Sequence, residues 1–478
     1  MIANRRSLSA HPRAVLVIQA VMFIAVIAVL VPMVSGSIGT YFLMALVGGI
    51  GAFWLVQRPH WGVLIILGSW FVEIDALAGL SYVVSAVLLV SLGMTILRDR
   101  GCWALGVPQI QVLLVIAFLF LLSTWWAEFK YPITLFPQKD QTARQMREFT
   151  THLAWLVFFL YFITTRKRIE LTVRLVVGLI VAAAASALYL FVTSQGADRA
   201  SAAFSFAGNS NRLAYVCLFA TTLVWFYRLY GPAQGWKVLT LPLIFFLPMG
   251  ALAAGSRSGL LQLATLGVLV VIDQKSWSAA KRMYSVFCMG LVGLMILALV
   301  PHAYLERATT FNPDTDAPGQ ESLQTRLHVI TSALKMIGSD PIFGAGIGNF
   351  PWVARAFYGS SGHTHNSYLW ALVAGGIGVF ALYLLLFYLT YRMLRQLERS
   401  GPQDLLWLSK GLRVSLVLFM IFSAFADFWL SDFMYLLIGL TIAMTYLWRR
   451  QQQLSSKMAT VPSVRFDSMG SLVAQPRG

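Results

Sequence analysis

The chain is long and strongly apolar, and its composition excludes an ordinary soluble domain. Its 478 residues are 58% hydrophobic and only 12% charged, and the apolar residues form repeated runs of about 20, the length that crosses a bilayer as a helix. We therefore predict a polytopic membrane protein. A net charge of +17 would suggest nucleic-acid binding in a soluble chain. In a membrane protein basic loops report orientation instead, so we expect no nucleic-acid partner.

The apolar runs predict an all-α protein with about 12–14 transmembrane helices. The pair at 61–74 and 79–97 is the least distinct, so twelve spans is the alternative to fourteen. The first run follows three arginines and is expected to remain as an uncleaved helix. The fourteen candidate spans are 14–34, 41–56, 61–74, 79–97, 108–126, 150–165, 171–194, 211–228, 238–253, 259–272, 283–302, 366–389, 411–428 and 433–448.

Loop charges predict the orientation of these spans. With the N-terminus in the cytoplasm, the basic clusters at 166–168 and 449–450 fall on the cytoplasmic side, as the positive-inside rule requires. Both termini are then cytoplasmic, and residues 1–449 form a single transmembrane helical domain. The polar stretch 450–478 lacks apolar periodicity and is predicted to be a disordered tail. The three cysteines, Cys102, Cys217 and Cys288, show no spacing typical of disulfides or zinc sites.

Three outward segments are longer than turns, namely 127–149, 195–210 and above all 303–365. Long loops in a compact chain are usually functional. In the last one, apolar residues at helical spacing predict an amphipathic helix, which either lies on the membrane surface or packs on the bundle. Its expected N-cap is Ser322, its end is Ser339-Asp340-Pro341, and its apolar stripe is Leu323, Leu327, Ile330, Leu334 and Ile337. Asp314 and Asp316, in a Pro/Gly-rich stretch, are expected to form turns rather than hold a metal.

Arginines near the outward helix ends run against the inside bias of positive charge. A guanidinium close to the hydrocarbon is costly unless an anion or water meets it. Guanidinium groups suit phosphate oxygens, so these residues predict a diphosphate ligand. The alternative is that each arginine reaches lipid headgroups or pairs with a nearby carboxylate such as Glu148. The four candidates are Arg144, Arg147, Arg212 and Arg257.

His363 and His365 lie in the sequence HTHNSY, where the longest polar segment meets a predicted span. An imidazole accepts a proton near neutral pH, so both histidines are candidate catalytic bases. The alternative for each is a structural histidine at the membrane interface. Asn366, Asp427 and Arg326 are candidates for orienting a histidine or binding an acceptor. Among the familiar nucleotide, nicotinamide and zinc motifs we find none, and we expect no cofactor and no metal.

Four stretches in this order resemble the O-antigen ligase and polymerase superfamily of bacterial inner-membrane glycosyltransferases. They are GNSNRLAY at 208–215, GSRSGLL at 255–261, TRLHVITSALKMIGSDPIFGAGIGNF at 325–350 and HTHNSYLWALVAGGIG at 363–378. The resemblance implies a periplasmic active site and an undecaprenyl-diphosphate-linked glycan as donor, without ATP or metal. It also implies His365 as the catalytic base with His363 beside it, and Arg212 and Arg257 on the donor diphosphate.

The acceptor is what separates the two activities of this superfamily. A ligase uses a sugar hydroxyl of lipid A-core oligosaccharide, whereas a polymerase uses another lipid-linked repeat unit. We predict the ligase and keep the polymerase as the alternative, because no physical rule decides the acceptor. A transporter, the third hypothesis, would favour charged residues in the middle of the spans. The predicted spans carry few, and ionisable residues gather at their outward ends instead.

Overall fold

The fold is given by a computed structural model. It describes residues 38–71, 75–99, 103–131, 139–194, 210–232, 236–273, parts of 278–293, 320–359, 362–428, 431–459, 464–466 and 472–474. Within these residues the chain is almost entirely helical. The predicted all-α class is confirmed. Asp314 and Asp316 lie outside the described residues.

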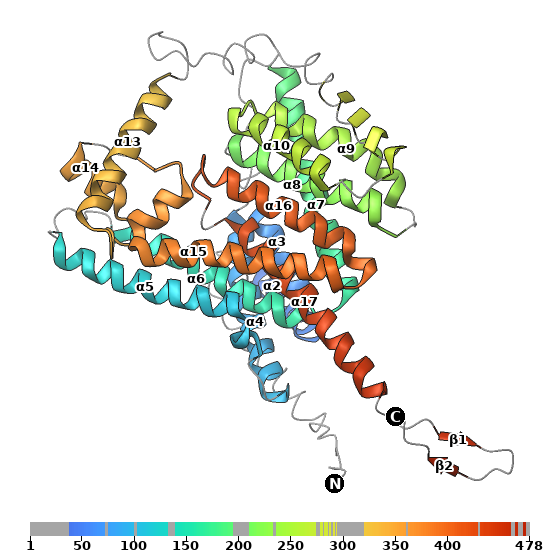
Figure 1. Cartoon of the computed structure of the whole chain (residues 1–478). Coiled ribbons are helices and arrows are strands. Elements are labelled where there is room, and N and C mark those ends of the chain that lie inside the picture. The colour runs from blue at the N-terminus through green and yellow to red at the C-terminus, as the bar shows by residue number, and fades with distance from the viewer. Residues whose placement is uncertain are drawn as a thin grey trace.

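The helices pack into one elongated bundle (Figure 1). Helices α5, α6 and α15 run in roughly the same direction, and α13 and α14 gather at one end. The helices are α2 (Ile38–Gln57), α3 (Pro59–Phe71), α4 (Asp75–Asp99), α5 (Pro108–Lys130), α6 (Lys139–Phe162), α7 (Arg166–Thr193), α8 (Ser210–Tyr230), α9 (Trp236–Ala253), α10 (Arg257–Asp273), α13 (Gln320–Ser339), α14 (Phe350–Tyr358), α15 (Ser367–Ser400), α16 (Leu406–Phe422) and α17 (Asp432–Ala459), with short 3-10 turns at Trp103–Gly106 and Gln403–Leu405.

Seven of the described helices are long and apolar enough to cross a membrane, or eight spans if one bent pair is counted as a single span. The polytopic class is therefore confirmed. The prediction of 12–14 spans counted apolar runs, and among the described residues fewer helices meet the required length and composition. α6 joins a polar half to an apolar half, and the apolar part of α10 is short. The predicted spans at 14–34 and most of 283–302 lie outside the described residues.

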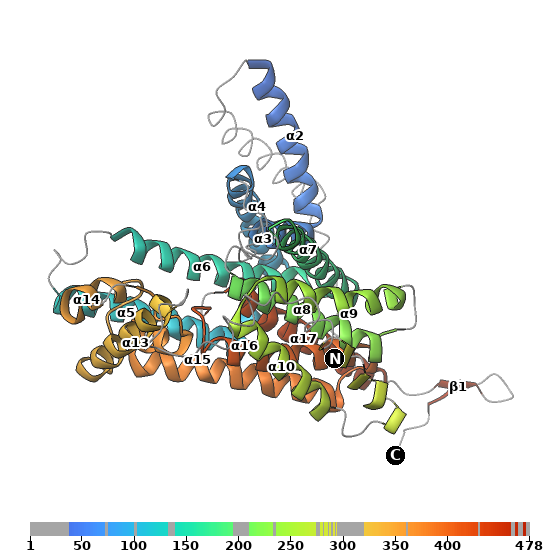
Figure 2. The same ribbon diagram turned by 90° about the horizontal axis from the view of Figure 1, so that it is seen from above.

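The predicted spans at 41–56 and 61–74 form the bent pair. The chain turns by 116° between α2 and α3, and Figure 2 shows α2 extending away from the bundle. Pro59 opens α3, and a proline disfavours helical geometry at the residue before it, here Arg58. The pair meets the length and composition of a span only when taken together, as one broken span or a re-entrant loop, and apolar length alone does not reveal such a sharp bend.

Helix α8 lies at the centre of the packing. Every residue from Leu213 to Phe226 is buried, unlike the half-exposed faces of its neighbours. Small residues let adjacent helices approach closely: a Cβ added at Gly259 of α10 would lie 2.7 Å from the Cβ of Ala214. Close contact through small residues is the usual way that membrane helices pack. The start of α8, which carries Arg212, is therefore held firmly against α10.

Helix α15 is broken at Gly376, where φ is 70° and ψ is −169°. The segment after α13 fits into this break. The Ile377 N–H donates to the Pro341 carbonyl at 2.9 Å, and the Ala345 N–H donates to the Val373 carbonyl at 2.7 Å. From α5, the Ser123 hydroxyl donates to the Ala374 carbonyl at 2.7 Å. Backbone groups freed by the break thus find partners, as a membrane environment demands, and the glycine-rich stretch 344–348 is locked in place.

The amphipathic helix predicted in the long loop is present as α13, but its buried face differs from the prediction. The helix ends at Ser339 as expected and begins at Gln320, which places Ser322 inside its first turn rather than at the N-cap. Its buried residues are Val329, Ala333 and Met336, whereas Leu327 and Leu334 of the predicted stripe are each 56% exposed. α13 packs on α14 and α15. Val329 and Ala333 allow this close packing because their side chains are small.

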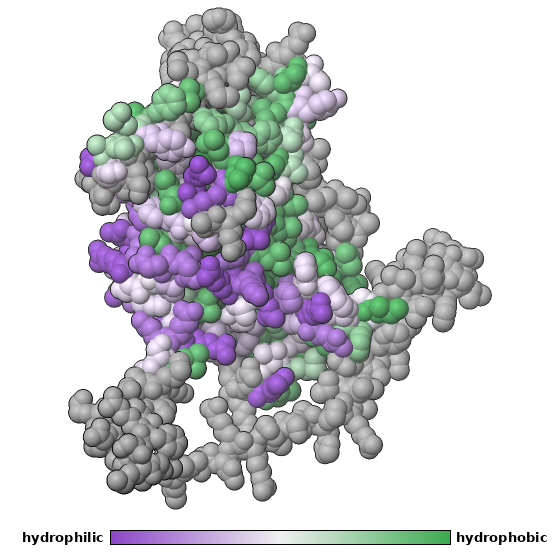
Figure 3. Space-filling view, turned by 90° about the vertical axis from the view of Figure 1, so that its right-hand side faces the viewer, coloured by the Kyte–Doolittle hydropathy of each residue, from purple (hydrophilic) through white to green (hydrophobic). Residues whose placement is uncertain are grey.

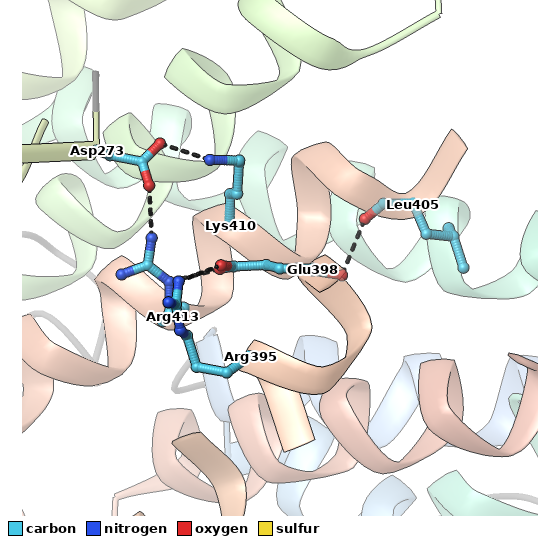
Figure 4. A network of polar contacts seen from close by, with 7 residues as sticks. Asp273, Arg395, Glu398, Leu405, Lys410 and Arg413 are labelled. Carbon is cyan, nitrogen blue, oxygen red and sulfur yellow. Dashed lines mark hydrogen bonds and ion pairs between the residues drawn. The ribbon is translucent and has the colours of Figure 1, made fainter. Parts of the chain in front are cut away.

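Buried ion pairs tie α10, α15 and α16 together at the opposite end of the bundle (Figure 4). Asp273 accepts hydrogen bonds from Lys410 at 2.8 Å and from Arg413 at 2.6 Å. Arg413 also donates to Glu398, which accepts at 3.0 Å from Arg395. Hydrophilic residues spread in a band over this side of the molecule (Figure 3). We call it the basic end, defined by the basic residues Arg166, Lys167, Arg168, Arg228, Lys237, Arg395, Arg399, Lys410 and Arg413.

Asp273→Asn is expected to destabilise the fold by about 3 kcal/mol, because the change leaves Lys410 and Arg413 buried with too little negative charge. The measurement is the unfolding midpoint of the purified protein in an SDS titration. Glu148→Gln is the matched control, since Glu148 pairs with Arg144 on the exposed surface of α6 and such pairs contribute less than about 1 kcal/mol. Equal midpoints for the two variants would contradict a stabilising network.

The C-terminal stretch departs from the predicted boundary at 449/450. α17 continues through Ala459, and Val464–Phe466 (β1) pairs antiparallel with Leu472–Ala474 (β2). The sequence QQQLSSKMA contains good helix formers, which explains why the helix extends past the apolar run. The absence of apolar periodicity therefore did not exclude secondary structure here.

Candidate functional site

The histidine-bearing loop is held against the turn between α16 and α17. Ser367, at the start of α15, makes three bonds to this turn. Its N–H donates to the Ser423 carbonyl, its hydroxyl donates to the Ala426 carbonyl, and the hydroxyl accepts from the Phe428 N–H, each at 2.7 Å. A fully bonded buried serine fixes two backbone segments relative to each other. The loop therefore has a defined position at the end of the bundle opposite the basic end.

The Asp427 carboxylate organises the loop from the same turn. One oxygen accepts from the Thr364 hydroxyl at 2.7 Å and from the Asn366 N–H at 3.0 Å, and the other accepts from the His365 N–H at 3.1 Å. A carboxylate with several N–H and O–H donors is a strong, directional anchor. Asp427 thus positions His365 through its backbone, as one of the roles predicted for it requires.

His365 adopts a strained backbone. Its φ is 48°, and within the described part of the chain it is the only non-glycine residue with positive φ. Such conformations cost about 1–3 kcal/mol and occur where the surroundings enforce them. The enforcing contacts are those of Asp427 and of the helix cap that follows. Strain that is maintained in this way often marks a functional position.

The surroundings of His365 favour its neutral form. Desolvation lowers the pKa of His365 below its ordinary value of 6.5, and the nearby charges of Arg326 and His363 lower it further, while Asp427 opposes the change. Since the side chain of His365 remains exposed, a neutral imidazole is available to accept a proton from a substrate.

Asn366 has a local structural role. It is the N-cap of α15, and its side-chain oxygen accepts from the N–H groups of Tyr368 and Leu369 at 2.9 and 3.0 Å. An N-cap of this kind stabilises a helix start by about 1 kcal/mol. The cap fixes the direction in which the chain leaves His365, while the predicted orienting or acceptor-binding role of Asn366 stays a prediction.

Arg212 lies next to this assembly. Its guanidinium carbon is 5.0 Å from the centre of the Phe428 ring, and Phe428 directly follows Asp427 in the chain. Stacking on an aromatic ring holds the guanidinium without neutralising its charge. Arg212 thus brings a positive charge beside the turn that positions His365.

A hydrogen-bonded cluster links the two arginine motifs. The Asn211 side-chain oxygen accepts from the hydroxyls of Ser256 and Ser258, and the Ser256 hydroxyl accepts from the Gly259 N–H at 3.2 Å. Arg257 stands between these serines and opens α10. The backbones that carry Arg212 and Arg257 are therefore brought together at one end of α8 and α10. The side chain of Arg257 is not among those that the structure describes.

Arg144 and Arg147 occupy a different place. Both lie on the first half of α6 and are exposed, and Arg144 donates to Glu148 one turn along the helix at 3.0 Å. This is the carboxylate pairing that formed the alternative interpretation for Arg144. Neither arginine makes a hydrogen bond or ion pair to the described residues around His365, so a role on the diphosphate rests on the sequence alone.

Three contributing residues were not singled out from the sequence, namely Thr364, Ser367 and Phe428. Thr364 and Ser367 flank the predicted residues within HTHNS, and Phe428 follows Asp427. Small hydroxyl side chains beside a candidate catalytic residue were the available signal. The partners of these hydroxyls could not be anticipated, because they lie about sixty residues away on the α16–α17 turn.

Residues 241–384 match the model of a family described as O-antigen ligase. The matched stretch runs from α9 into α15 and contains Arg257, Arg326, His363 and His365, while the structure adds Arg212 and Asp427 from outside it. No curated protein matches the chain. Over this stretch the chain is similar to the O-antigen ligase family, and its apolar spanning helices are those of a multi-pass membrane protein.

Proposed function

We propose that the protein is an O-antigen ligase. In this proposal it transfers a glycan from undecaprenyl diphosphate to a sugar hydroxyl of lipid A-core oligosaccharide on the periplasmic side of the membrane. The observation that carries the proposal is the strained loop at His365, which Asp427 anchors and where the pKa of the imidazole is lowered. The family match over residues 241–384 supports the class of reaction.

The proposed reaction is a single displacement. His365 accepts the proton of the acceptor hydroxyl while its oxygen forms a bond to the anomeric carbon of the donor glycan. The bond from that carbon to the diphosphate oxygen breaks, and its electron pair leaves with undecaprenyl diphosphate. Attack from the face opposite the leaving group inverts the anomeric centre. The diphosphate ester is already activated, so the proposal requires neither ATP nor a metal.

The arginines are proposed to stabilise the leaving group. Negative charge grows on the diphosphate as its bond to the sugar breaks, and preorganised positive charges lower the energy of that state. Arg212, which stacks on the Phe428 ring, is the best supported of the four candidates. The backbone of Arg257 is held near that of Arg212 by the hydrogen bonds of Asn211. Arg144 and Arg147 are proposed only for the first encounter with the donor headgroup, because they lie exposed on α6.

The orientation proposed from the loop charges fits this chemistry. The basic end then faces the cytoplasm, both chain termini lie there, and the His365 loop faces the periplasm. A periplasmic epitope tag inserted after Gly359, where α14 ends, should be modified by a membrane-impermeant thiol or amine reagent in intact spheroplasts. If the tag is labelled only after the cells are opened, the orientation is the opposite of the one proposed.

The rate of transfer is expected to fall at low pH with a midpoint below 6.5, because His365 must be neutral to act as a base and its pKa is lowered. Arg326→Gln removes a positive charge that lowers this pKa, so the acid limb should move to higher pH. Asp427→Asn removes the opposing negative charge, so the limb should move to lower pH. The measurement is kcat/KM against pH. Shifts of the same sign in both variants would contradict His365 as the titrating group.

A comparison of two substrate mixtures separates the ligase from the polymerase. Purified protein is incubated with lipid-linked glycan alone, and with lipid-linked glycan plus lipid A-core, each with and without a chelator. The ligase proposal predicts product only when lipid A-core is present, in equal amounts with and without chelator. Longer lipid-linked chains from the donor alone would establish the polymerase instead.

A further inference from the structure

A groove opens at the basic end of the bundle, away from the His365 loop. It lies between α7, α8, α9 and the first turn of α16, and its open space, including solvent at the mouth, is about 490 Å³. α8 begins beside Arg212 and ends at Tyr230, so Tyr227 in its last turn lies at the far end of the helix. The inner wall is aliphatic, formed by Val173, Val177, Leu223, Val224 and Leu243.

One buried polar group of the groove lacks a partner. Trp407 is 3% exposed and lines the groove, and its indole N–H makes no hydrogen bond to any described residue. Its ring packs edge-on against Tyr227, with centroids 4.9 Å apart. A buried donor without an acceptor costs about 1–3 kcal/mol, and a Trp N–H usually finds a partner when it is buried. An acceptor oxygen from a bound molecule would remove this cost.

Positive charge surrounds the mouth of the groove. Arg174 lines it with its guanidinium 5.3 Å from the centre of the Trp236 ring, and the side chain is about half exposed. Glu170 lies 3.7 Å from Arg174 and supplies one negative charge. Two further basic residues lie beside Trp236, since the Arg228 guanidinium donates to the Lys237 carbonyl at 3.0 Å. The mouth therefore favours an anion, while the interior favours hydrocarbon.

Helix α9, which lines the groove through Trp236, Thr240 and Leu243, also has an outer face directed at lipid. On α9, Val238 is 78% exposed and Leu239 is 52% exposed, as expected for residues that contact acyl chains. Trp236 opens the same helix, and tryptophan is typical of the level where lipid headgroups meet the hydrocarbon. A ligand can therefore enter sideways from the bilayer.

From these observations we infer that the groove binds one anionic diacyl phospholipid, with an acyl chain along the aliphatic wall and the phosphate at Arg174. The glycerol ester carbonyls of such a lipid lie below its phosphate, where Trp407 is buried, and they accept hydrogen bonds. A polyprenyl phosphate is also anionic but has no oxygen below its phosphate, so it leaves the Trp407 N–H without a partner. This binding is separate from the glycan transfer proposed above.

The test measures lipid binding to the full-length purified protein by native mass spectrometry. The probes are phosphatidylglycerol, phosphatidylcholine with the same acyl chains, and undecaprenyl phosphate. We expect one phosphatidylglycerol bound in preference to the other two. Arg174→Gln should abolish the preference over phosphatidylcholine, because the charge at the mouth is lost. Trp407→Phe keeps the aromatic packing but removes the N–H. It should weaken the binding of phosphatidylglycerol about fivefold, the effect of one net hydrogen bond.

Trp225→Phe is the matched control. Trp225 is also buried with an indole N–H that makes no hydrogen bond to the described residues, but it does not line the groove, so its replacement should leave lipid binding unchanged. Equal loss in Trp407→Phe and Trp225→Phe would overturn the proposal, as would equal binding of phosphatidylglycerol and phosphatidylcholine by the wild type. Preferential binding of undecaprenyl phosphate would show that the ligand is a polyprenyl lipid, and would also overturn the proposal.

Discussion

Gly376→Ala is expected to destabilise the protein by about 3 kcal/mol or more, because two unfavourable effects coincide at this position. With φ at 70° and ψ at −169°, the backbone adopts a conformation that is almost confined to glycine. An added Cβ would also lie 1.9 Å from the Ile342 carbonyl oxygen. The backbone of the 341–345 segment cannot move away without losing its hydrogen bonds to α15. The measurement is the unfolding midpoint of the purified protein.

Gly378→Ala provides the matched control two residues further along α15. There the nearest atom to an added Cβ is the flexible Cδ1 of Leu119, at 3.3 Å, and alanine favours helix over glycine by about 1 kcal/mol. The midpoint of this variant should stay close to the wild type. If Gly376→Ala unfolds no more easily than Gly378→Ala, the break in α15 is not the anchor for the 341–345 segment.

The fold class was predictable because apolar runs of spanning length are a strong local signal, and the structure confirms helices at most of them. What could not be predicted depends on contacts between distant segments. The bend between α2 and α3 and the break at Gly376 interrupt stretches that look uniform in hydropathy. The face of α13 that is buried also depends on its partners, which is why Leu327 and Leu334 are exposed although they continue the apolar stripe.

The residues of the candidate site could also be predicted only in part. His363, His365 and Arg212 stood out from the sequence because charged or titratable residues at helix ends are unusual in an apolar chain. Their grouping needs the turn at 423–428, which lies about sixty residues from the histidines, and the Asn211–Ser256 bond, which joins residues 45 apart. Only the structure shows that Asp427 anchors the backbone of His365 and that Arg144 pairs with Glu148.

His365→Ala is expected to lower the rate of glycan transfer by about 10²–10⁴-fold, the usual contribution of a general base. The variant should fold normally, since the contacts that hold the loop use the backbone of residue 365 and the side chains of Asp427, Thr364 and Ser367. Alanine tolerates φ near 48° less well than histidine, so the unfolding midpoint is measured alongside the rate. His363→Ala is the comparison. It removes an equivalent imidazole two residues away and should reduce the rate far less.

The most direct measurement is single-turnover transfer of glycan from undecaprenyl diphosphate to lipid A-core by purified His365→Ala protein, beside wild type and His363→Ala. We predict rapid product formation by the wild type, a modest reduction for His363→Ala, and almost no product for His365→Ala with an unfolding midpoint close to that of the wild type. Product formed by His365→Ala at the wild-type rate would contradict the account, because no base would then be required at the loop that Asp427 anchors.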